Sequence, residues 1–307
     1  MKIYSMVFVI LVFSFAESYC GRNTAAFPEV STASSAGISG ACSAKQSDIN
    51  ALTYNPAAIY GIHNVTAMFT YDNNSLINSS STLTTIVIPG QNDCTFALSY
   101  VFDRQSGVTD APYGASDLSR YNRIVTAAYA FSAAENIKLG AAVKYLDSTI
   151  VSNKTSYMAF DAGAVFTGDF GLTSSVSILN LGDQFLYTDP LSLLSHEILP
   201  LKLGVGLNYD LPIDNINSIS FSADCFYHVN ESRYAAAIGM EYVFQNMITA
   251  RFGDNVDAKG LDFISWGAGF NYDFYGIKTR LDYAYSVKIS GTGDNGASNL
   301  LSILVFF

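Results

Sequence analysis

The chain has 307 residues, of which 50% are hydrophobic and 14% are charged, against a usual charged share of about a quarter. The apolar content excludes a disordered chain. No unbroken apolar run reaches the roughly 20 residues of a membrane-spanning helix, which excludes a helical membrane protein. The net charge of −10 argues against nucleic acid as a partner. An all-β protein remains, either soluble or a membrane barrel.

The first residues have the composition of a secretory signal. Lys2 precedes an apolar core over 6–15, and a small-x-small cleavage site follows. The core is too short to anchor the chain as a helix. We therefore expect a signal peptide over 1–18. Lipidation at Cys20 is the less favoured alternative, because the large Tyr19 precedes that cysteine.

Residues 19–63 are rich in small residues and lack the alternation of a strand. Within this region Asp48 can cap a short helical turn, which Pro56 ends. The cysteines show no C-x-x-C spacing, so zinc and thioredoxin chemistry have no support. If an exported chain forms one disulfide, Cys42–Cys94 is the favoured pair, and free thiols are an equally good interpretation.

From residue 64 onward, apolar side chains alternate with polar or small ones. In 201–210, for example, the odd positions are apolar and the even positions are Lys, Gly, Asn or Asp. A period of two is typical of strands with one apolar face. The pattern predicts fourteen strands, near 64–71, 82–89, 94–102, 122–131, 137–148, 157–167, 171–179, 201–210, 217–228, 233–244, 247–253, 261–273, 276–287 and 299–307. Long connections are expected near 103–121 and 180–200.

Three features favour a membrane barrel over a soluble β-sandwich. The apolar face continues on strand after strand, as lipid contact requires. Aromatic residues such as Tyr145 and Phe244 stand at strand ends, where interfacial girdles form. The last predicted strand ends in Phe307, which resembles the assembly signal of bacterial outer-membrane barrels. We therefore predict an antiparallel meander barrel of about fourteen strands.

Residues 46–63 (QSDINALTYNPAAIYGIH) resemble the segment before the first strand of FadL-like and PorV/PorQ-type outer-membrane barrels. The pattern is D-x-x-A-x-x-x-N-P-A-G, and the residues that match it are Asp48, Ala51, Asn55, Pro56 and Ala57. Ala58 stands where the family has glycine. Further matches follow in order at 138–145 (KLGAAVKY), 180–182 (NLG), 199–204 (LPLKLG), 239–242 (GMEY), 251–253 (RFG) and 267–272 (GAGFNY).

The resemblance implies a bacterial outer-membrane barrel over 64–307, with 19–63 as a plug in its lumen. The FadL-like branch admits long-chain fatty acids and other hydrophobic molecules, and the PorV-type branch serves as a shuttle or adaptor in protein secretion. We expect passive uptake of hydrophobic small molecules, with long-chain fatty acids as the favoured substrate, and keep the adaptor as the alternative. The expected partners are outer-membrane lipid, a hydrophobic ligand and the barrel-assembly machinery.

No catalytic constellation or cofactor motif is found, so we expect neither an enzyme nor a cofactor. His63, His196 and His228 are far apart and lack the spacing of metal ligands. Asp48 and the Asn55-Pro56-Ala57 segment have two equally supported interpretations, as a gate of the plug or as the end of a helical turn.

Inward charges are expected along the lumen. The basic ones are Lys138, Lys144, Lys202, Arg251, Lys278 and Arg280, and the acidic ones are Asp161, Asp210, Asp224, Glu241 and Asp282. Arg251 and Arg280 are the best candidates for a carboxylate headgroup site, because arginine binds a carboxylate with two parallel hydrogen bonds. The favoured alternative is that these charges pair across neighbouring strands.

Overall fold

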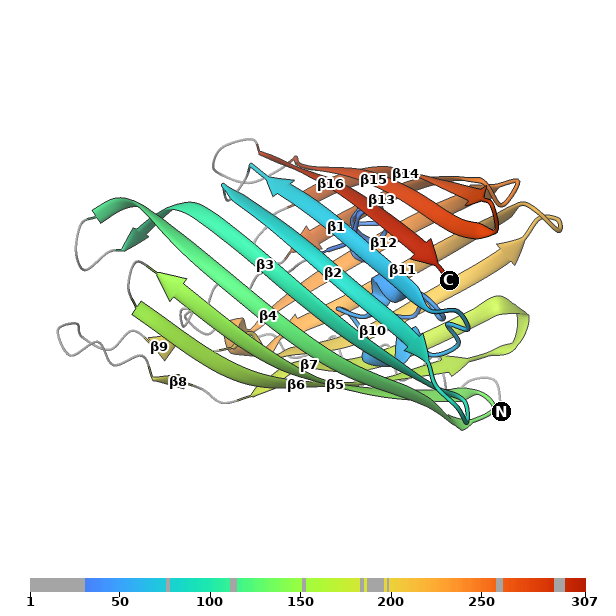
Figure 1. The fold of residues 1–307 in the computed structure, drawn as a ribbon, viewed down its shortest axis with the longest axis horizontal. Helices are drawn as coiled ribbons and strands as arrows, with labels where there is room; N and C mark the ends of the chain where they lie inside the picture. The colour runs from blue at the N-terminus through green and yellow to red at the C-terminus, as the bar shows by residue number, and fades with distance from the viewer. Residues whose placement is uncertain are drawn as a thin grey trace.

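The computed structural model describes residues 31–75, 78–110, 115–150, 153–182, 185–186, 196–197, 199–257, 262–289 and 296–307. The predicted signal peptide over 1–18 and the alternative of lipidation at Cys20 lie outside these residues. Fourteen antiparallel strands close into a barrel (Figure 1), in which each strand pairs with its neighbours along the chain and the first pairs with the last. The predicted all-β meander barrel is confirmed.

All fourteen predicted strands are present, with shifted ends. The barrel strands are β1 (Thr66–Asn74), β2 (Ser79–Pro89), β3 (Cys94–Asp110), β4 (Ala115–Ala134), β5 (Ile137–Ile150), β6 (Asn153–Thr167), β7 (Leu172–Gly182), β10 (Lys202–Pro212), β11 (Ser218–His228), β12 (Arg233–Phe244), β13 (Ile248–Asp257), β14 (Asp262–Phe274), β15 (Ile277–Lys288) and β16 (Ala297–Phe306). β8 (Phe185–Leu186) and β9 (His196–Glu197) form a separate two-stranded sheet.

The prediction of a long connection near 103–121 was wrong. β3 and β4 continue through most of it as a paired extension, with Asp103 opposite Asn122 and Arg104 opposite Tyr121. Because this stretch is rich in polar residues, it lacks the alternation that marks the other strands. The extension reaches past the neighbouring strands at one end of the barrel (Figure 1).

The two ends of the barrel differ. We call the end where β1 begins and β16 ends the proximal end, and the other the distal end. The proximal end has short turns, over 90–93, 135–136, 168–171, 213–217, 245–247 and 275–276. The distal end has the β3–β4 extension and the connection from β7 to β10, which contains β8 and β9.

The outer surface of the barrel is apolar. On β10, Leu203, Val205 and Leu207 are 42–43% exposed, and the side chains between them, beginning with Lys202, are buried. Each of the fourteen barrel strands carries at least one exposed large apolar side chain. The inner face carries polar and small side chains together with buried apolar ones such as Met68, Leu83 and Leu304, which belong to one buried cluster with Ile59. The apolar side chains of the outer face are exposed, as in a barrel surrounded by lipid.

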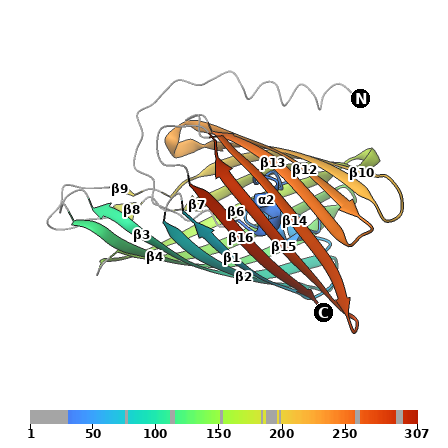
Figure 2. The same ribbon diagram turned by 90° about the horizontal axis from the view of Figure 1, so that it is seen from above.

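A segment inside the barrel, residues 31–63, is called the lumenal segment below. It contains α2 (Ala33–Gly37) and two 3-10 turns, η2 (Ile49–Ala51) and η3 (Pro56–Ile59). Figure 2 shows α2 behind β14 and β15, enclosed by the barrel wall. α2 packs against β14, β15 and β16, and η3 packs against β4, β5 and β6. Among the described residues, no helix is both long and apolar enough to cross a bilayer.

The cysteines of the described chain are unbridged. Cys42 is buried in the lumenal segment, whereas Cys94 begins β3 and Cys225 lies on β11. The Cys42–Cys94 disulfide is therefore not formed, and the free-thiol interpretation holds.

Candidate functional site

Asn55 fixes the N-P-A segment to the barrel wall. Its side-chain oxygen accepts from the backbone N–H of Ala57 at 3.0 Å, which caps η3. Its amide donates to the carbonyl of Ser43 at 3.1 Å and to that of Ala164 on β6 at 3.2 Å. Pro56 occupies the first position of η3, where its missing N–H costs nothing. Asn55 thus joins two parts of the lumenal segment to one strand.

Two wall glycines make room for this segment. A Cβ on Gly140 of β5 would lie 2.3 Å from the backbone nitrogen of Ala57, and a Cβ on Gly163 of β6 would lie 2.0 Å from Asn55 Oδ1. Gly140 and Gly163 are directly opposite each other across the β5–β6 pair. The wall therefore has a seat for Asn55-Pro56-Ala57, and only glycine fits it.

Asp48 has a local structural contact. Its carboxylate accepts from the backbone N–H of Asn50 at 2.9 Å and caps η2. Its own N–H donates to the carbonyl of Ala58 at 3.3 Å. The predicted gate residues Asp48, Asn55, Pro56 and Ala57 therefore lie together, and they connect η2 to η3.

A row of ion pairs holds the other side of the lumenal segment to the wall. Lys45 Nζ donates to Glu241 on β12 at 3.0 Å. Arg251 on β13 donates to Glu241 through Nε at 2.6 Å and to Asp282 on β15 through Nη1 at 2.8 Å. Arg280 donates to Asp282 at 3.0 Å and to Ser34 Oγ at 3.1 Å. The row begins and ends on the lumenal segment.

Lys45 stays charged in this setting. Burial alone would lower the pKa of its ammonium group, but the negative charge of Glu241 outweighs burial and raises that pKa above its ordinary value. The contact with Glu241 is therefore an ion pair at neutral pH.

Both arginines predicted for a headgroup already contact carboxylates. The Arg251 side chain is 0% exposed, and the Arg280 side chain is 20% exposed. Of these contacts, that of Arg251 with Glu241 joins neighbouring strands, as the alternative expects. Arg280 and Asp282 lie on one strand, and Arg251 and Asp282 are two strands apart. The headgroup role of Arg251 and Arg280 stays a prediction, and its ligand would have to compete with Glu241 and Asp282.

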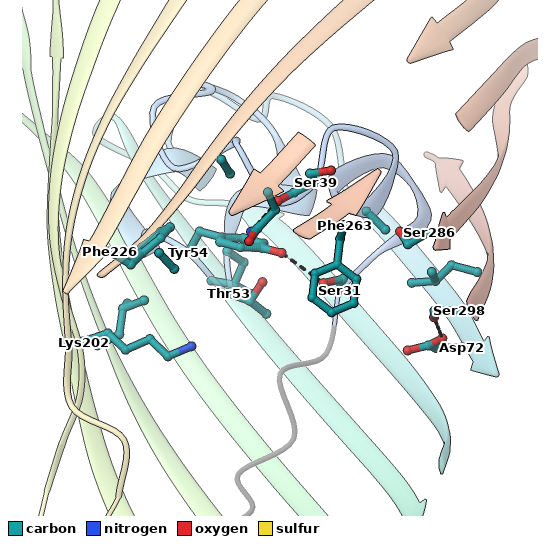
Figure 3. A pocket seen from close by; sticks show the side chains of 18 of the residues that line it. Ser31, Ser39, Thr53, Tyr54, Asp72, Lys202, Phe226, Phe263, Ser286 and Ser298 are labelled. Atoms are coloured by element: carbon teal, nitrogen blue, oxygen red, sulfur yellow. Dashed lines mark hydrogen bonds between the residues drawn. The ribbon is translucent and has the colours of Figure 1, made fainter. Parts of the chain in front are cut away.

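A cavity of about 400 Å³ lies between the lumenal segment and the distal half of the barrel. Its floor includes Leu52, Thr53 and Tyr54, and Tyr54 is held by a hydrogen bond between its hydroxyl and that of Ser31 at 3.0 Å. Figure 3 shows Thr53 and Tyr54 between Lys202 on one side and Asp72 on the other. The volume falls within the range of about 300–1,000 Å³ that small-molecule sites occupy.

The lining of the cavity is both apolar and charged. The apolar part is Leu52, Val101, Ile124, Leu179, Phe226, Phe263 and Leu300, with several alanines. On one side Lys202, His228 and Arg233 also line it, and they are direct cross-strand neighbours on β10, β11 and β12. Lys144 on β5 lines the cavity too, and it forms an ion pair with Asp161 at 2.6 Å.

The other side of the cavity is polar and acidic. Asp72 on β1 accepts a hydrogen bond from Ser298 on β16 (Figure 3). A ligand in this cavity therefore meets cationic side chains on one side and an acidic group on the other.

Sequence reasoning placed Lys144 and Lys202 on the inner face but missed His228 and Arg233. These two residues flank one predicted turn, because one predicted strand ends at 228 and the next starts at 233. Hairpin pairing across that turn makes them opposite neighbours, which was the available signal.

Phe307 follows the end of β16. The backbone N–H of Phe307 donates to the carbonyl of Val65 at 2.8 Å, and its side chain is 69% exposed. Its role as an assembly signal stays a prediction.

No protein-family model and no curated protein matches the sequence. Among solved structures, a Pseudomonas aeruginosa FadL homologue is 13% identical, with a TM-score of 0.60 over 95% of this chain and 99% of that one. The monoaromatic hydrocarbon channel CymD is 10% identical, with a TM-score of 0.64 over 89% and 96%. The Pseudomonas putida toluene transporter TodX is 11% identical, with a TM-score of 0.62 over 94% and 99%. The chain therefore has the fold of a FadL-like barrel.

Proposed function

We propose that the barrel lies in the bacterial outer membrane and admits hydrophobic small molecules without energy input. The observation that carries this proposal is the cavity of about 400 Å³, enclosed by the wall and floored by the lumenal segment. The apolar outer surface of all fourteen strands supports the membrane location. The likeness to a FadL homologue and to toluene transporters supports the substrate class.

The orientation follows from the two ends of the barrel. Outer-membrane barrels have short turns toward the periplasm and longer connections outside the cell. The proximal end then faces the periplasm, and the cavity is on the outer side of the lumenal segment. A ligand would enter from the distal end and meet Leu52, Thr53 and Tyr54 before it could pass.

The lumenal segment is the plug and gate in this proposal. Asn55-Pro56-Ala57 sits in the glycine seat of β5 and β6, and Lys45 holds the opposite side to Glu241. Further attachments join the segment to the wall, among them Arg280 to Ser34 and the Ser43 N–H to Asp224, and passage requires attachments of this kind to be released.

Within the hydrophobic class, we favour an anionic amphiphile, with long-chain fatty acids as the substrate. Lys202, His228 and Arg233 lie in register on three adjacent strands. Arg233 also forms an ion pair with Glu231, and a carboxylate head beside Lys202 would accept a charge-assisted hydrogen bond from its ammonium group. The apolar lining next to this row suits an alkyl chain.

Binding of labelled palmitate to the detergent-solubilised barrel tests this proposal, with hexadecanol and toluene as competitors. We expect palmitate to bind and Lys202→Met to weaken binding by about 10-fold or more, because a charge-assisted hydrogen bond contributes roughly 1.5–3 kcal/mol. Lys154→Met is the matched control, since Lys154 is 61% exposed and lies outside the cavity.

The other outcomes separate the alternatives. Equal binding of palmitate and hexadecanol would overturn the anionic head but keep the hydrophobic channel. Displacement by toluene alone would point to hydrocarbons. Failure to bind all three would overturn the channel, and a protein partner captured by the same preparation would then favour the adaptor.

A further inference from the structure

The contacts between the lumenal segment and the wall differ around the barrel. Polar contacts attach the segment along one arc, from the glycine seat on β5 and β6 through β7, β11, β12, β13 and β15 to β16. Their wall partners beyond the seat are Ser175, Asp224, Glu241, Asn255, Arg280 and Ser302. We call this the polar arc, and β1–β4 complete the closed barrel.

Toward β1–β4 the contact is apolar. Ile49, Leu52 and Ile59 of the lumenal segment belong to one buried cluster with side chains from all four strands. The wall members with large side chains are Met68 on β1, Leu83 and Val87 on β2, Val101 on β3 and Ile124 on β4. Each of these residues is at most 5% exposed. We call this contact the apolar seam.

The apolar seam reaches from the cavity to the proximal end. Leu52, Val101 and Ile124 belong to the seam and also line the cavity. At the other end, Ile62 and Phe306 pack against the same cluster. Phe306 is the last residue of β16 and lies opposite Thr66, the first residue of β1. A buried apolar contact therefore connects the cavity with the proximal end of the barrel.

The hydroxyl groups along the seam are paired within the wall. Thr85 on β2 donates to Ser99 on β3 at 3.1 Å. The hydroxyls of Thr70 on β1 and Ser302 on β16 are 2.7 Å apart. An alkyl chain that passes them leaves these buried groups with their partners, as buried polar groups require.

Opening the polar arc is more costly than opening the seam. Displacing Ser43 would take its N–H from Asp224 and its hydroxyl from Ser175, two residues that are 4% and 3% exposed. An apolar ligand replaces neither contact, and a buried polar group without a partner is costly. At the seam, an alkyl chain replaces one apolar contact by another, so the apolar area hidden from water is kept.

We propose that a hydrophobic ligand leaves the cavity along the apolar seam, between Leu52 and Ile59 on one side and the wall of β1–β4 on the other. Ser43 stays attached to the polar arc during passage, and only attachments at the edges of that arc are released. This proposal rests on the proposed function and adds the path that the ligand takes past the plug.

Ser43 is well placed to stay attached. It lies against β10, where a Cβ on Gly206 would be 2.1 Å from its hydroxyl oxygen. It contacts the strands on both sides of β10, through Ser175 on β7 and Asp224 on β11. In the closed order of fourteen strands, β10 is seven strands from β1 in either direction. The fixed point therefore lies opposite the beginning of the seam.

Uptake of labelled palmitate by cells that lack their own channel for it tests the path, with one substitution at two matched positions. Thr85 in the wall of the seam and Thr173 on β7 both face the lumen, are 1% and 6% exposed, and lie outside the cavity lining. We expect Thr85→Asp to lower uptake by about 10-fold or more, because a carboxylate in an apolar passage is costly. Thr173→Asp should lower it by less than about 2-fold.

The binding of palmitate to the detergent-solubilised barrel should be the same in both variants, since the cavity is unchanged. Equal loss of uptake in the two variants would overturn the proposal. So would full uptake by Thr85→Asp, which would mean that the ligand leaves the cavity elsewhere, for example through the wall into lipid.

A second substitution covers the case in which Thr85→Asp fails to assemble. Ala97 on β3 is 6% exposed and lies opposite Val87 of the seam. Ala97→Leu narrows the seam without adding a charge and should lower palmitate uptake by about 3-fold or more. Ala127→Leu is its control, because Ala127 is exposed on the outer face of β4. Unchanged uptake by a folded, heat-modifiable Ala97→Leu barrel would overturn the proposal.

A disulfide tests whether Ser43 stays in place. The hydroxyls of Ser43 and Ser175 are 2.8 Å apart, so Ser43→Cys with Ser175→Cys can form a bond in a chain whose other cysteines are replaced by serine. We expect equal uptake by the oxidised protein and by the same protein after dithiothreitol. Uptake that stops on oxidation and returns on reduction would overturn the proposal, because the whole segment would then have to leave. If the unmodified chain neither binds nor admits palmitate, the proposed function itself fails, and this result is distinct from a failure of the path.

Discussion

Asn55 of the lumenal segment lies directly against Gly163 of the barrel wall. The Asn55 amide donates to the carbonyl of Ala164 at 3.2 Å, and a Cβ on Gly163 would lie 2.0 Å from Asn55 Oδ1. The segment that floors the cavity is therefore attached to β6 at a position that tolerates no added methyl group. Asn55 can reach the wall because Gly163 has no side chain at this position.

Gly163→Ala is expected to displace the N-P-A segment and leave the barrel closed. The added methyl group overlaps Asn55, and overpacking of this kind costs about 1–3 kcal/mol. Limited proteolysis in detergent should cut within 31–63 faster than in the unchanged protein, while heat-modifiable migration of the barrel is kept. Ala162→Val is the control, because Ala162 is exposed on the outer face. Unchanged proteolysis of Gly163→Ala would contradict the glycine seat.

Asn55→Ala should loosen the same segment by a different route. The carbonyls of Ser43 and Ala164 lose a donor, and η3 loses its cap. A buried group left unsatisfied costs about 1–3 kcal/mol. Hydrogen exchange of 43–60 should accelerate, and exchange of β10–β12 should stay as in the unchanged protein. Equal acceleration in both regions would mean that Asn55 supports the whole barrel.

Lys45→Met should release the opposite side of the segment. It removes one of the two cations that donate to Glu241, which keeps Arg251, so the expected cost is below the about 3–5 kcal/mol of a buried charge left unpaired. Faster proteolysis within 31–63 is expected. Lys154→Met, which removes an exposed ion pair, should have no effect. If both variants behave alike, Lys45 is not an attachment.

The contact of Lys45 also predicts a pH dependence. Because the folded pKa of Lys45 is raised above its ordinary value of 10.5, the stabilisation is fully present below that value and is lost as the pH rises through the higher folded pKa. Proteolysis within 31–63 should therefore not change between neutral pH and a pH of about 10 through this group. An acceleration near pH 8 that Lys45→Met abolishes would contradict the assigned charge.

Cys42 offers a reporter for displacement of the floor. Its thiol is buried, and burial raises its pKa well above the usual value, so it should be inert toward maleimide at neutral pH. In a chain whose other cysteines are replaced by serine, labelling should be slow and should accelerate in Gly163→Ala. Rapid labelling without that substitution would show that the floor opens spontaneously.

The sequence was sufficient to predict the strands but not the contacts inside the barrel. Alternation is a local signal, so β10 and β11 could be placed within a residue or two. The polar stretch 103–121 carries no such signal. Its residues pair because β3 and β4 are already hydrogen-bonded to each other nearer the proximal end, from Cys94 opposite Phe131 onward.

The site was predictable only in part. The family pattern brought Asp48 and Asn55 together because they belong to one segment. Glu241 could be paired with Arg251 from the β12–β13 hairpin, in which the two are opposite each other. Asp282 could not, because β13 and β15 are not neighbours in the barrel. In the sequence, Gly140 and Gly163 look like ordinary small residues of a strand. Their requirement for glycine comes from contact with Asn55-Pro56-Ala57, which lies about 80 to 110 residues away in the chain.

Uptake of labelled palmitate by cells that lack their own channel for it tests the central claim most directly. We expect this chain to restore uptake, Lys202→Met to reduce it by about 10-fold at low palmitate concentration, and Lys154→Met to leave it unchanged. No uptake of palmitate or toluene by cells whose outer-membrane fraction contains the folded, heat-modifiable barrel would contradict the account.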